Sequence, residues 1–352
     1  MKAMEDLKTL GVSVILPMHN EEKIVKFAIQ SLLNQTFKYI DIICVLDNCT
    51  DNTENILLND FEDNIQVKIF KTINNTGKKA GALNQLLDYH FDDLKNKVLI
   101  MDADTILAKD AVAKGIKFLN NNKDHAAVCS MAGVLNVKSK NILWYLQNIE
   151  YGFGDSGFIE TQGNVFVCRG MYSMYCKSSL ENVLNRGYIY DLNSITEDYE
   201  LTLELKRLNY KISSSTEIKA YTEVPITLKE LWIQRVRWIK GGVEDLIKHG
   251  LKRHTLYDIW TSVFYRFLIL IQLVFMVELL FVKHINISWL IVLSFILTIN
   301  SLFRLKYIRH KSKITYIILF TMIPMLFYGF LDAILTIYAT YLAIFKIKIK
   351  WR

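Results

Sequence analysis

Two aspartates one residue apart, Asp102 and Asp104, follow the apolar run VLIM and could hold a divalent cation. Mg²⁺ and Mn²⁺ prefer carboxylate oxygens and often share them with the phosphates of a bound nucleotide. A pair of this spacing also occurs by chance in loops that bind nothing. Because this pair comes directly after an apolar run, it is a candidate site for a divalent cation.

Two further polar segments also stand directly after apolar runs. Asp47 follows one of them, and its carboxylate could accept a hydrogen bond from a base or a ribose. Lys79 stands in a turn rich in Gly and Lys at the start of a predicted helix, where its charge and the helix N-terminus could offset a phosphate. The alternatives are a helix cap at Asp51 or Asn52 and solvated lysines at a turn.

An acid pair, Glu197 and Asp198, precedes a stretch with leucines at helical spacing. A carboxylate at that helix N-terminus could act as a general base, taking a proton from a hydroxyl group. The alternative is that the acid pair caps the helix and favours its dipole.

Gln234, Arg237 and Trp238 are spaced i, i+3 and i+4, which places them on one face of a helix. A hydrogen-bond donor, a cation and a flat aromatic ring on one face suit a diphosphate and a sugar. The surrounding region 228–258 is amphipathic and rich in Trp, so the alternative is an anchor at a membrane surface.

The elements that must position these residues alternate between apolar strands and helices. The predicted strands are Val12–Leu16, closed by Pro17, Ile40–Leu46, Val67–Phe70 and Val98–Met101. The predicted helices are Glu21–Leu33, Asp51–Leu58 and Ala80–Tyr89. This alternation predicts a parallel sheet covered on both faces, with its ligand beyond the carboxyl ends of the strands.

Charge is distributed unevenly along the 352 residues, whose net charge is +7. Residues 257–352 hold eleven Lys and Arg against three Asp and Glu, whereas the first 256 hold 31 against 32. The excess positive charge therefore accompanies the long apolar runs. This combination predicts membrane helices with basic flanks and argues against a nucleic-acid partner.

Three apolar runs predict a membrane domain. They are Val263–Val282, Ile285–Phe303 and Ile314–Phe345, the last interrupted by Pro324 and Gly329. The last run exceeds the roughly 20 residues that one spanning helix needs. Because the loop Arg304–Lys313 and the C-terminal tail Lys346–Arg352 are basic, both are expected on the cytosolic side. Three or four membrane helices satisfy these constraints.

These patterns divide the chain into a cytosolic α/β domain at 1–227, an amphipathic interface helix region at 228–258 and a membrane domain at 259–352. The N-terminal residues lack the apolar core of a signal peptide, so the first domain is expected in the cytoplasm and the protein in the cell membrane as a multi-pass enzyme. The five Cys form no CxxC pair, so they predict reduced thiols and no zinc site.

Taken together, the motifs resemble the family 2 inverting glycosyltransferases, especially the membrane-embedded branch with the cellulose, hyaluronan and poly-N-acetylglucosamine synthases. The matching segments are VSVILPMHNEE (12–22), DNCTD (47–51), GKKAGALN (77–84), MDADT (101–105), ITEDYELTLEL (195–205) and QRVRWIKGG (234–242). The resemblance spans roughly residues 10–245. It implies a GT-A fold, a Rossmann-like nucleotide-binding domain, followed by C-terminal transmembrane helices.

The resemblance assigns the nucleotide site to five residues. Asp47 matches the acid that contacts uracil, and Glu21 is a weaker candidate for a uridine contact. Lys79 matches the lysine of the KAG motif near the nucleotide. Asp102 and Asp104 match the DxD motif, with Asp104 the more direct ligand of Mg²⁺ or Mn²⁺.

The resemblance also assigns the acceptor side. Asp198 matches the catalytic base of the TED motif. Gln234, Arg237 and Trp238 match QxxRW, which closes over the diphosphate and borders the acceptor. With these parts a base would activate the acceptor hydroxyl, and a single displacement would invert the anomeric carbon.

The resulting expectation is a UDP-sugar-dependent hexosyltransferase that extends a polysaccharide or glycolipid with a β-glycosidic bond. One alternative is a single addition onto a lipid carrier. Another is a non-catalytic membrane subunit that only binds nucleotide. The expected partners are the UDP-sugar, a polysaccharide or lipid-linked acceptor and membrane lipids, while a homo-oligomer and an export partner stay open.

Overall fold

The computed structural model describes the chain outside residues 1–10, 136–139, 161–162, 282–298, 300–302 and 349–352. The chain forms two compact units. Unit 1 comprises Met1–Leu135 and Phe158–Glu223, and unit 2 comprises Asn136–Gly157 and Val224–Arg352. The segment Asn136–Gly157, which the sequence analysis included in the domain at 1–227, therefore groups with the C-terminal helices.

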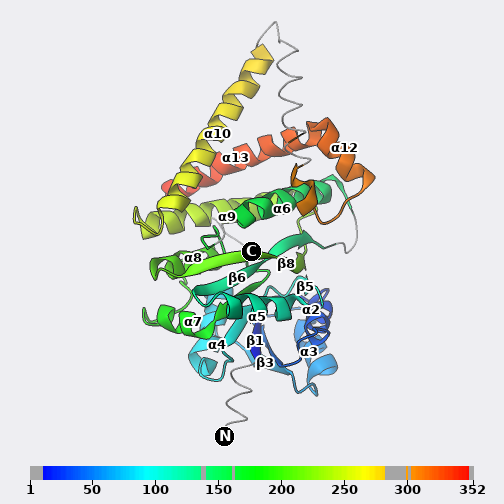
Figure 1. The fold of residues 1–352 in the computed structure, drawn as a ribbon, viewed down its shortest axis with the longest axis vertical. Helices are drawn as coiled ribbons and strands as arrows, with labels where there is room; N and C mark the ends of the chain where they lie inside the picture. The colour runs from blue at the N-terminus through cyan, green and yellow to red at the C-terminus, as the bar shows by residue number, and fades with distance from the viewer. Residues whose placement is uncertain (1–10, 136–139, 161–162, 282–298, 300–302, 349–352) are drawn as a thin grey trace. The chain divides into compact units, whose positions relative to one another are not determined.

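Unit 1 is built on one mixed sheet, with eight strands among the described residues (Figure 1). From edge to edge its strands are β3 (Val67–Lys71), β2 (Ile40–Leu46), β1 (Val12–Met18), β4 (Lys97–Ile100), β7 (Ser173–Cys176), β6 (His125–Val134), β8 (Lys211–Thr222) and β5 (Thr105–Leu107). The first four strands are parallel, as predicted. Their carboxyl ends therefore meet at one edge of the sheet.

The prediction of a wholly parallel sheet is wrong, because β7 runs antiparallel to β4 and β6, and β5 runs antiparallel to β8. Beyond β4 the sheet gains its next strand from the segment after Gly170. The backbone N–H of Asp102 donates to the carbonyl of Gly170 at 3.0 Å, at the carboxyl end of β4. The chain thus re-enters the sheet from that end and must run back along β4.

Strand β1 also continues past Pro17, where the sequence analysis expected it to end. Pairing of β1 with β4 stops at Ile15 opposite Ile100, whereas pairing with β2 continues to Met18 opposite Leu46. In a strand, residues two apart direct their backbone groups to the same side, so Pro17 faces the same side as Ile15. That is the side of β4, where pairing has already ended. Its missing N–H therefore costs no ladder hydrogen bond.

The helices of unit 1 flank this sheet. They are α2 (Val25–Leu33), α3 (Thr53–Phe61), α4 (Lys78–His90), α5 (Ala111–Asn121), α7 (Lys177–Leu184) and α8 (Glu197–Arg207). Helix α4 buries Leu83, Leu86 and Leu87 in the same core cluster as Leu201 and Leu205 of α8. The i, i+3 and i+4 spacing of these side chains forms the apolar stripe that packs each helix.

Unit 2 is helical in the described residues. Its elements are α6 (Ile142–Glu160), α9 (Leu228–His249), α10 (Leu256–Phe281), the short 3-10 helix η1 (Leu305–Tyr307), α12 (Lys313–Thr321) and α13 (Ile323–Ile344). Thr227 caps α9, with its side chain accepting from the N–H of Glu230. Gly250, with φ of 70°, follows the helix, so the region 228–258 holds α9 and the first residues of α10.

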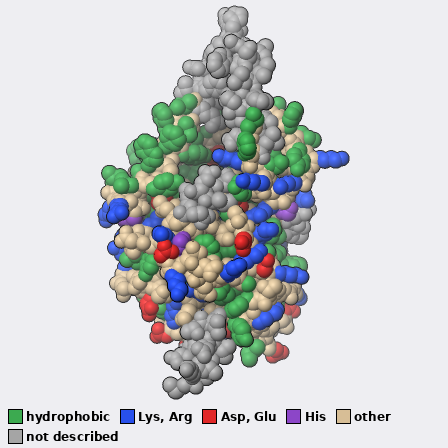
Figure 2. All heavy atoms as spheres, in the orientation of Figure 1, with side chains coloured by type: hydrophobic (Ala, Val, Ile, Leu, Met, Phe, Trp, Pro, Cys, Tyr) green, Lys and Arg blue, Asp and Glu red, His purple; other side chains and the backbone are tan. Residues whose placement is uncertain are grey.

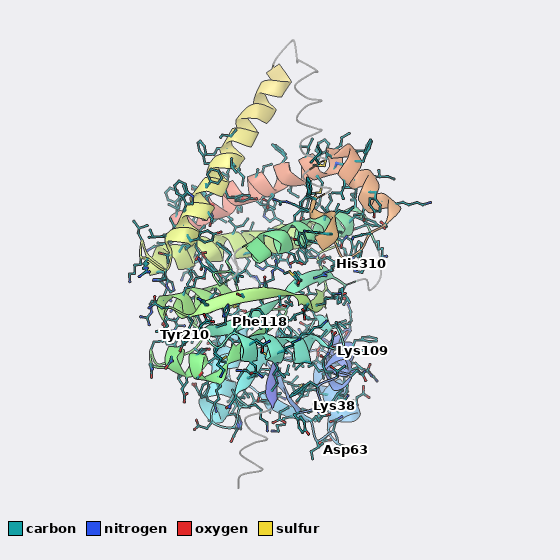
Figure 3. The ribbon with its side chains drawn as sticks, in the orientation of Figure 1. Lys38, Asp63, Lys109, Phe118, Tyr210 and His310 are labelled. Carbon is teal, nitrogen blue, oxygen red and sulfur yellow. The ribbon has the colours of Figure 1, made fainter. Side chains whose placement is uncertain are left out.

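Charged and aromatic contacts join the helices of unit 2. Arg235 of α9 donates to Glu150 of α6 at 2.8 Å, and the hydroxyl of Tyr328 on α13 donates to the same carboxylate at 2.6 Å. His310, labelled in Figure 3, lies with its ring centroid 5.2 Å from that of Trp144 on α6. These contacts tie the segment around Glu150 to the C-terminal helices.

The predicted break in the run Ile314–Phe345 falls at Met322, which has φ of 57° and separates α12 from α13. Pro324 lies in the first turn of α13, where it lacks only a hydrogen bond that the helix would not make. Gly329 lies inside α13, so the run forms one short and one long helix.

Apolar side chains are exposed along the helices of unit 2, and Figure 2 shows them over α10 and α12 on the face drawn. Examples are Trp260, Phe267, Phe320 and Phe327, which are 69%, 56%, 79% and 71% exposed. Exposed apolar surface of this kind indicates contact with a partner or a membrane. In the part of the chain that the structure describes, α13 alone is long and apolar enough to cross a membrane. The predicted run Ile285–Phe303 lies almost wholly outside the described residues.

Candidate active site

The predicted nucleotide-site residues of unit 1 gather at one edge of its sheet. Asp47 follows β2, Lys79 lies in the first turn of α4 after β3, and Asp102 follows β4. β2 and β4 flank β1 and β3 pairs with β2, all in parallel, so the carboxyl ends of these strands bring the side chains together. The order of apolar strand and polar loop in the sequence is what produces this gathering.

Lys79 is held by carboxylates. Its Nζ lies 2.6 Å from Oδ1 of Asp102 and 2.9 Å from Oε1 of Glu197. Burial opposes its positive charge, but Asp102 and Glu197 outweigh burial and keep the pKa of Lys79 well above its ordinary value. Lys79 is therefore a charged ammonium group that joins the loop after β4 to helix α8.

Asp198 lies in the first turn of α8 and is half-buried. Its Oδ2 accepts a hydrogen bond from the N–H of Gly170 at 3.2 Å, and its Oδ1 accepts from the N–H of Tyr199 at 2.8 Å. Burial, followed by repulsion from Glu197, raises the pKa of Asp198 to about 6. The carboxylate is thus fixed in position, and it is a stronger base than an exposed aspartate.

Asp104 belongs to the same edge. Its Oδ1 accepts from the hydroxyl of Thr222 at 3.1 Å and from that of Thr105 at 3.3 Å. Burial and the Asp102 carboxylate raise the pKa of Asp104 to about 7. Burial, then Asp104 and Asp102, raise the pKa of Glu21 to about 8. The three carboxylates thus repel one another and would be stabilised by a cation.

The chemistry of this donor set fits a hard divalent ion, because carboxylate oxygens dominate it. Within the described residues, no three or more His, Cys, Asp or Glu side chains are grouped so as to hold a metal by themselves. Asp102 and Asp104 could hold such an ion only with oxygens from elsewhere, such as phosphate or water.

Asp47 is buried, with 6% of its surface exposed, and three side chains order it. Its Oδ1 accepts from the hydroxyl of Thr72 at 2.9 Å and from the amides of Asn75 at 2.8 Å and Asn48 at 3.1 Å. No described residue donates to Oδ2. The carboxylate is therefore held in one orientation, with its second oxygen available to a ligand.

Gln234, Arg237 and Trp238 belong to α9 of unit 2. Gln234 is half-buried and Arg237 is exposed, while Trp238 is 37% exposed. Arg235 is buried, whereas Arg237 is exposed. The guanidinium of Arg235 lies 4.5 Å from the ring centroid of Trp238. The motif by itself does not point to Arg235, because the resemblance concerns Gln234, Arg237 and Trp238.

Gly170 and Thr222 were likewise missed. Gly170 contacts both Asp102 and Asp198 through its backbone, and Thr222 ends β8 beside Asp104. A glycine or a threonine alone gives no chemical signal. Only the pairing of β4 with β7, and of β8 with β5, brings them to the site.

Comparisons with known proteins identify the family. Residues 13–184 match the family model described as glycosyl transferase family 2. The poly-beta-1,6-N-acetyl-D-glucosamine synthase of Staphylococcus epidermidis is 29% identical over 322 residues, covering 89% of this chain and 71% of that protein. The synthase of the same name from Staphylococcus aureus strain COL is 30% identical over 241 residues, covering 68% of this chain and 56% of that protein.

Solved structures confirm the predicted α/β fold of the GT-A class. The mannosyltransferase PcManGT from Pyrobaculum calidifontis, solved with GDP-Man and Mn²⁺, has a TM-score of 0.62 at 14% identity and covers 97% of this chain and 88% of that chain. S. aureus TarS has a TM-score of 0.51 at 18% identity, covering 73% of this chain and 43% of that chain. Such low identity supports the fold alone.

The family model matches the strands and loops that position Asp47, Lys79, Asp102 and Asp104. The relatives extend the similarity over most of the chain. Both findings confirm the resemblance that the motifs indicated. The chain is therefore a family 2 glycosyltransferase.

Proposed function

We propose that this glycosyltransferase is a membrane-bound, inverting polysaccharide synthase that uses a UDP-sugar, with UDP-GlcNAc as the first donor to test. The observation that supports it best is the hydrogen-bonded, half-buried carboxylate of Asp198 beside Lys79 and Asp102. Similarity to poly-beta-1,6-N-acetyl-D-glucosamine synthases supports the choice of sugar and of a polymeric product.

Asp198 is the general base in this proposal. Its raised pKa favours proton abstraction from an acceptor hydroxyl, because a stronger base takes the proton more readily. As the proton moves to Asp198, the acceptor oxygen attacks the anomeric carbon and the nucleoside diphosphate leaves from the opposite face. One displacement inverts the configuration, so an α-linked donor yields a β-glycoside.

The donor side holds the nucleotide. Asp47 would accept a hydrogen bond from the base at its second carboxylate oxygen, with Glu21 nearby at the same sheet edge. Asp104 and Asp102 would hold Mg²⁺ or Mn²⁺ together with phosphate oxygens. When bound, such an ion offsets the negative charge that develops on the leaving diphosphate.

The membrane part of the proposal rests on unit 2. Exposed aromatic and aliphatic side chains on α10, α12 and α13 would contact lipid, and the basic residues between Arg304 and Lys313 would stay on the cytosolic side. We propose a multi-pass arrangement, with α13 as one crossing and a cytoplasmic catalytic unit. Arg237 and Trp238 are exposed on α9, and a cation and a flat aromatic ring are side chains that suit a diphosphate and a sugar.

A donor panel tests the proposal. Purified full-length protein in detergent is incubated with UDP-GlcNAc, UDP-Glc, UDP-GlcA and GDP-Man, each with Mg²⁺ or Mn²⁺, and nucleotide release and product mass are followed. We expect UDP release from UDP-GlcNAc and a ladder of products one sugar apart. A single added sugar would favour a lipid-carrier transferase, and turnover of GDP-Man alone would overturn the uridine assignment.

In the same assay, Asp47→Ala tests the base contact. We expect KM for the UDP-sugar to rise about tenfold or more, because a lost hydrogen bond to a charged group is worth roughly 1.5–3 kcal/mol. Turnover at saturating donor should change little. Asp88→Ala, at an exposed position on α4, is the control.

The pH profile tests Asp198. Its pKa is raised to about 6, and only the ionised carboxylate can accept the proton. Activity should therefore be retained above pH 6 and decline about tenfold per pH unit as the pH falls below that value. The measurement is kcat/KM between pH 4.5 and 8.5 at constant ionic strength. A profile that stays flat down to pH 4.5 would contradict the assignment.

A further inference from the structure

Two contacts join the loop after β4 to the N-terminus of α8, and both lie within unit 1. The first is the Lys79 ammonium, which pairs with Asp102 at 2.6 Å and Glu197 at 2.9 Å. The second is the backbone of Gly170, whose carbonyl accepts from Asp102 at 3.0 Å and whose N–H donates to Asp198 at 3.2 Å. We call these two contacts the Lys79–Gly170 bridge.

The site leaves no room for a side chain at position 170. A Cβ built on Gly170 would lie 2.7 Å from Oδ2 of Asp102 and 3.0 Å from Nζ of Lys79. The two close atoms are the ends of side chains and not backbone, so an alanine would displace the ion pair without forcing the fold apart. Gly170 is thus required for the approach of Asp102 to the segment that holds Asp198.

Both ion pairs of Lys79 belong to the Lys79–Gly170 bridge. Its side chain is 29% exposed, and it has a carboxylate partner on each of two segments distant in sequence. An ammonium group has three donors, so two ion pairs leave one donor for any other ligand. The resemblance implies a place for Lys79 near the nucleotide, whereas in the structure its ammonium group contacts the carboxylates of Asp102 and Glu197.

The segment of Gly170 is itself tied to α8. The N–H of Cys168 donates to the hydroxyl of Thr202 at 2.9 Å, and that hydroxyl donates to the carbonyl of Asp198 at 2.6 Å. Lys79, Gly170, Glu197 and Asp198 also line one small pocket. A shift of Gly170 would therefore move Asp198 and not merely loosen a loop.

We propose that Lys79 and Gly170 are positioning residues, which hold the general base Asp198 at a set distance from the donor-side aspartate Asp102. The inference rests on the proposed function, because that proposal makes Asp198 the base. Its consequence is specific. Loss of the bridge should slow the chemical step, whereas loss of a phosphate contact would weaken donor binding and raise KM.

The test uses Lys79→Met, Lys79→Arg and Gly170→Ala in the full-length protein, with Lys117→Met, exposed on α5, as control. We measure kcat and KM for UDP-GlcNAc and the Kd of UDP with Mn²⁺. For Lys79→Met and Gly170→Ala, kcat should fall about 10²-fold, as for a misplacement of about 1 Å. For Lys79→Met, which leaves Asp102 in place, KM and the UDP Kd should change less than about threefold, and Lys79→Arg should regain much of kcat.

Thermal melts with and without UDP establish that each variant is folded. If Gly170→Ala is unfolded, the two variants Lys79→Met and Lys79→Arg still test the positioning role. If Lys79→Met bound UDP tenfold more weakly with unchanged kcat, the positioning role of Lys79 would be wrong. Such a result would indicate that Lys79 contacts a phosphate of the donor.

A second arm separates the bridge from the base assignment. Lys79→Met is repeated in an Asp198→Asn background, where the bridge has no base left to position. We expect its additional effect on kcat to drop below about threefold, because two residues that act as a unit are not additive. A full 10²-fold effect in that background would overturn the bridge alone. Near wild-type turnover by Asp198→Asn itself would instead overturn the base.

Discussion

Asp198→Asn is expected to lower kcat for sugar transfer by about 10²–10⁴-fold, the usual contribution of a positioned general base. The N–H groups of Gly170 and Tyr199 bond different oxygens of the carboxylate, so the amide oxygen can still accept from one of them while the other hydrogen bond is lost. The amide cannot take a proton from the acceptor. The fold and the donor site should therefore survive while the chemical step fails.

The measurement is initial-rate UDP release with acceptor at saturation, together with the Kd of UDP and a thermal melt. UDP affinity should stay within about twofold of wild type. Glu217→Gln, at an exposed position on β8, removes a charge elsewhere in unit 1 and should leave both quantities unchanged. Transfer by Asp198→Asn at more than about a tenth of the wild-type rate would show that another group takes the proton.

Asp104→Ala is expected to lower kcat/KM by at least about 10²-fold, because charge stabilisation at the leaving group is usually a large term in catalysis. The variant also removes one of the carboxylates that repel each other at this edge. Unlike Asp198→Asn, it should weaken the binding of Mn²⁺ in the presence of UDP. Mn²⁺ binding followed by electron paramagnetic resonance separates the two variants.

Chelation provides the complementary experiment. EDTA should abolish transfer by the wild-type enzyme, and added Mn²⁺ or Mg²⁺ should restore it. Asp88→Asn, exposed on α4, is the matched control and should bind Mn²⁺ as the wild type does. If Asp104→Ala bound Mn²⁺ with unchanged affinity and retained activity, the metal site would have to be sought at other carboxylates.

The predicted strands before residue 101 agree with the structure within one or two residues. Ile40–Leu46 is β2 throughout, and Val98–Met101 differs from β4 by one residue at each end. Such strands can be predicted from the sequence because they are continuous apolar runs bounded by polar turns. Their parallel order then places the polar residues after them at one edge.

The later strands were not predicted. β7 covers only Ser173–Cys176, and β5 only Thr105–Leu107. Short strands like these leave little periodic pattern, and their direction depends on where the chain re-enters the sheet. The same holds for α6, whose residues Ile142–Gly157 group with helices more than 60 residues further along the chain. Whether a helix packs in one core or another depends on contacts with residues distant in the sequence, and the composition of the helix itself does not specify them.

The chemistry available to this protein follows from its residue types and their order along the chain. Asp47, Asp102 and Asp104 indicate a nucleotide site, since carboxylates after parallel strands must meet at one sheet edge. Asp198, at the start of a predicted helix, indicates a base. The contacts of each group depend on the packing of segments that are distant in the sequence. Lys79 proves to pair with carboxylates on two segments, because β4 and α8 pack on the same core beside α4. Gly170 enters the site only because β7 runs back along β4.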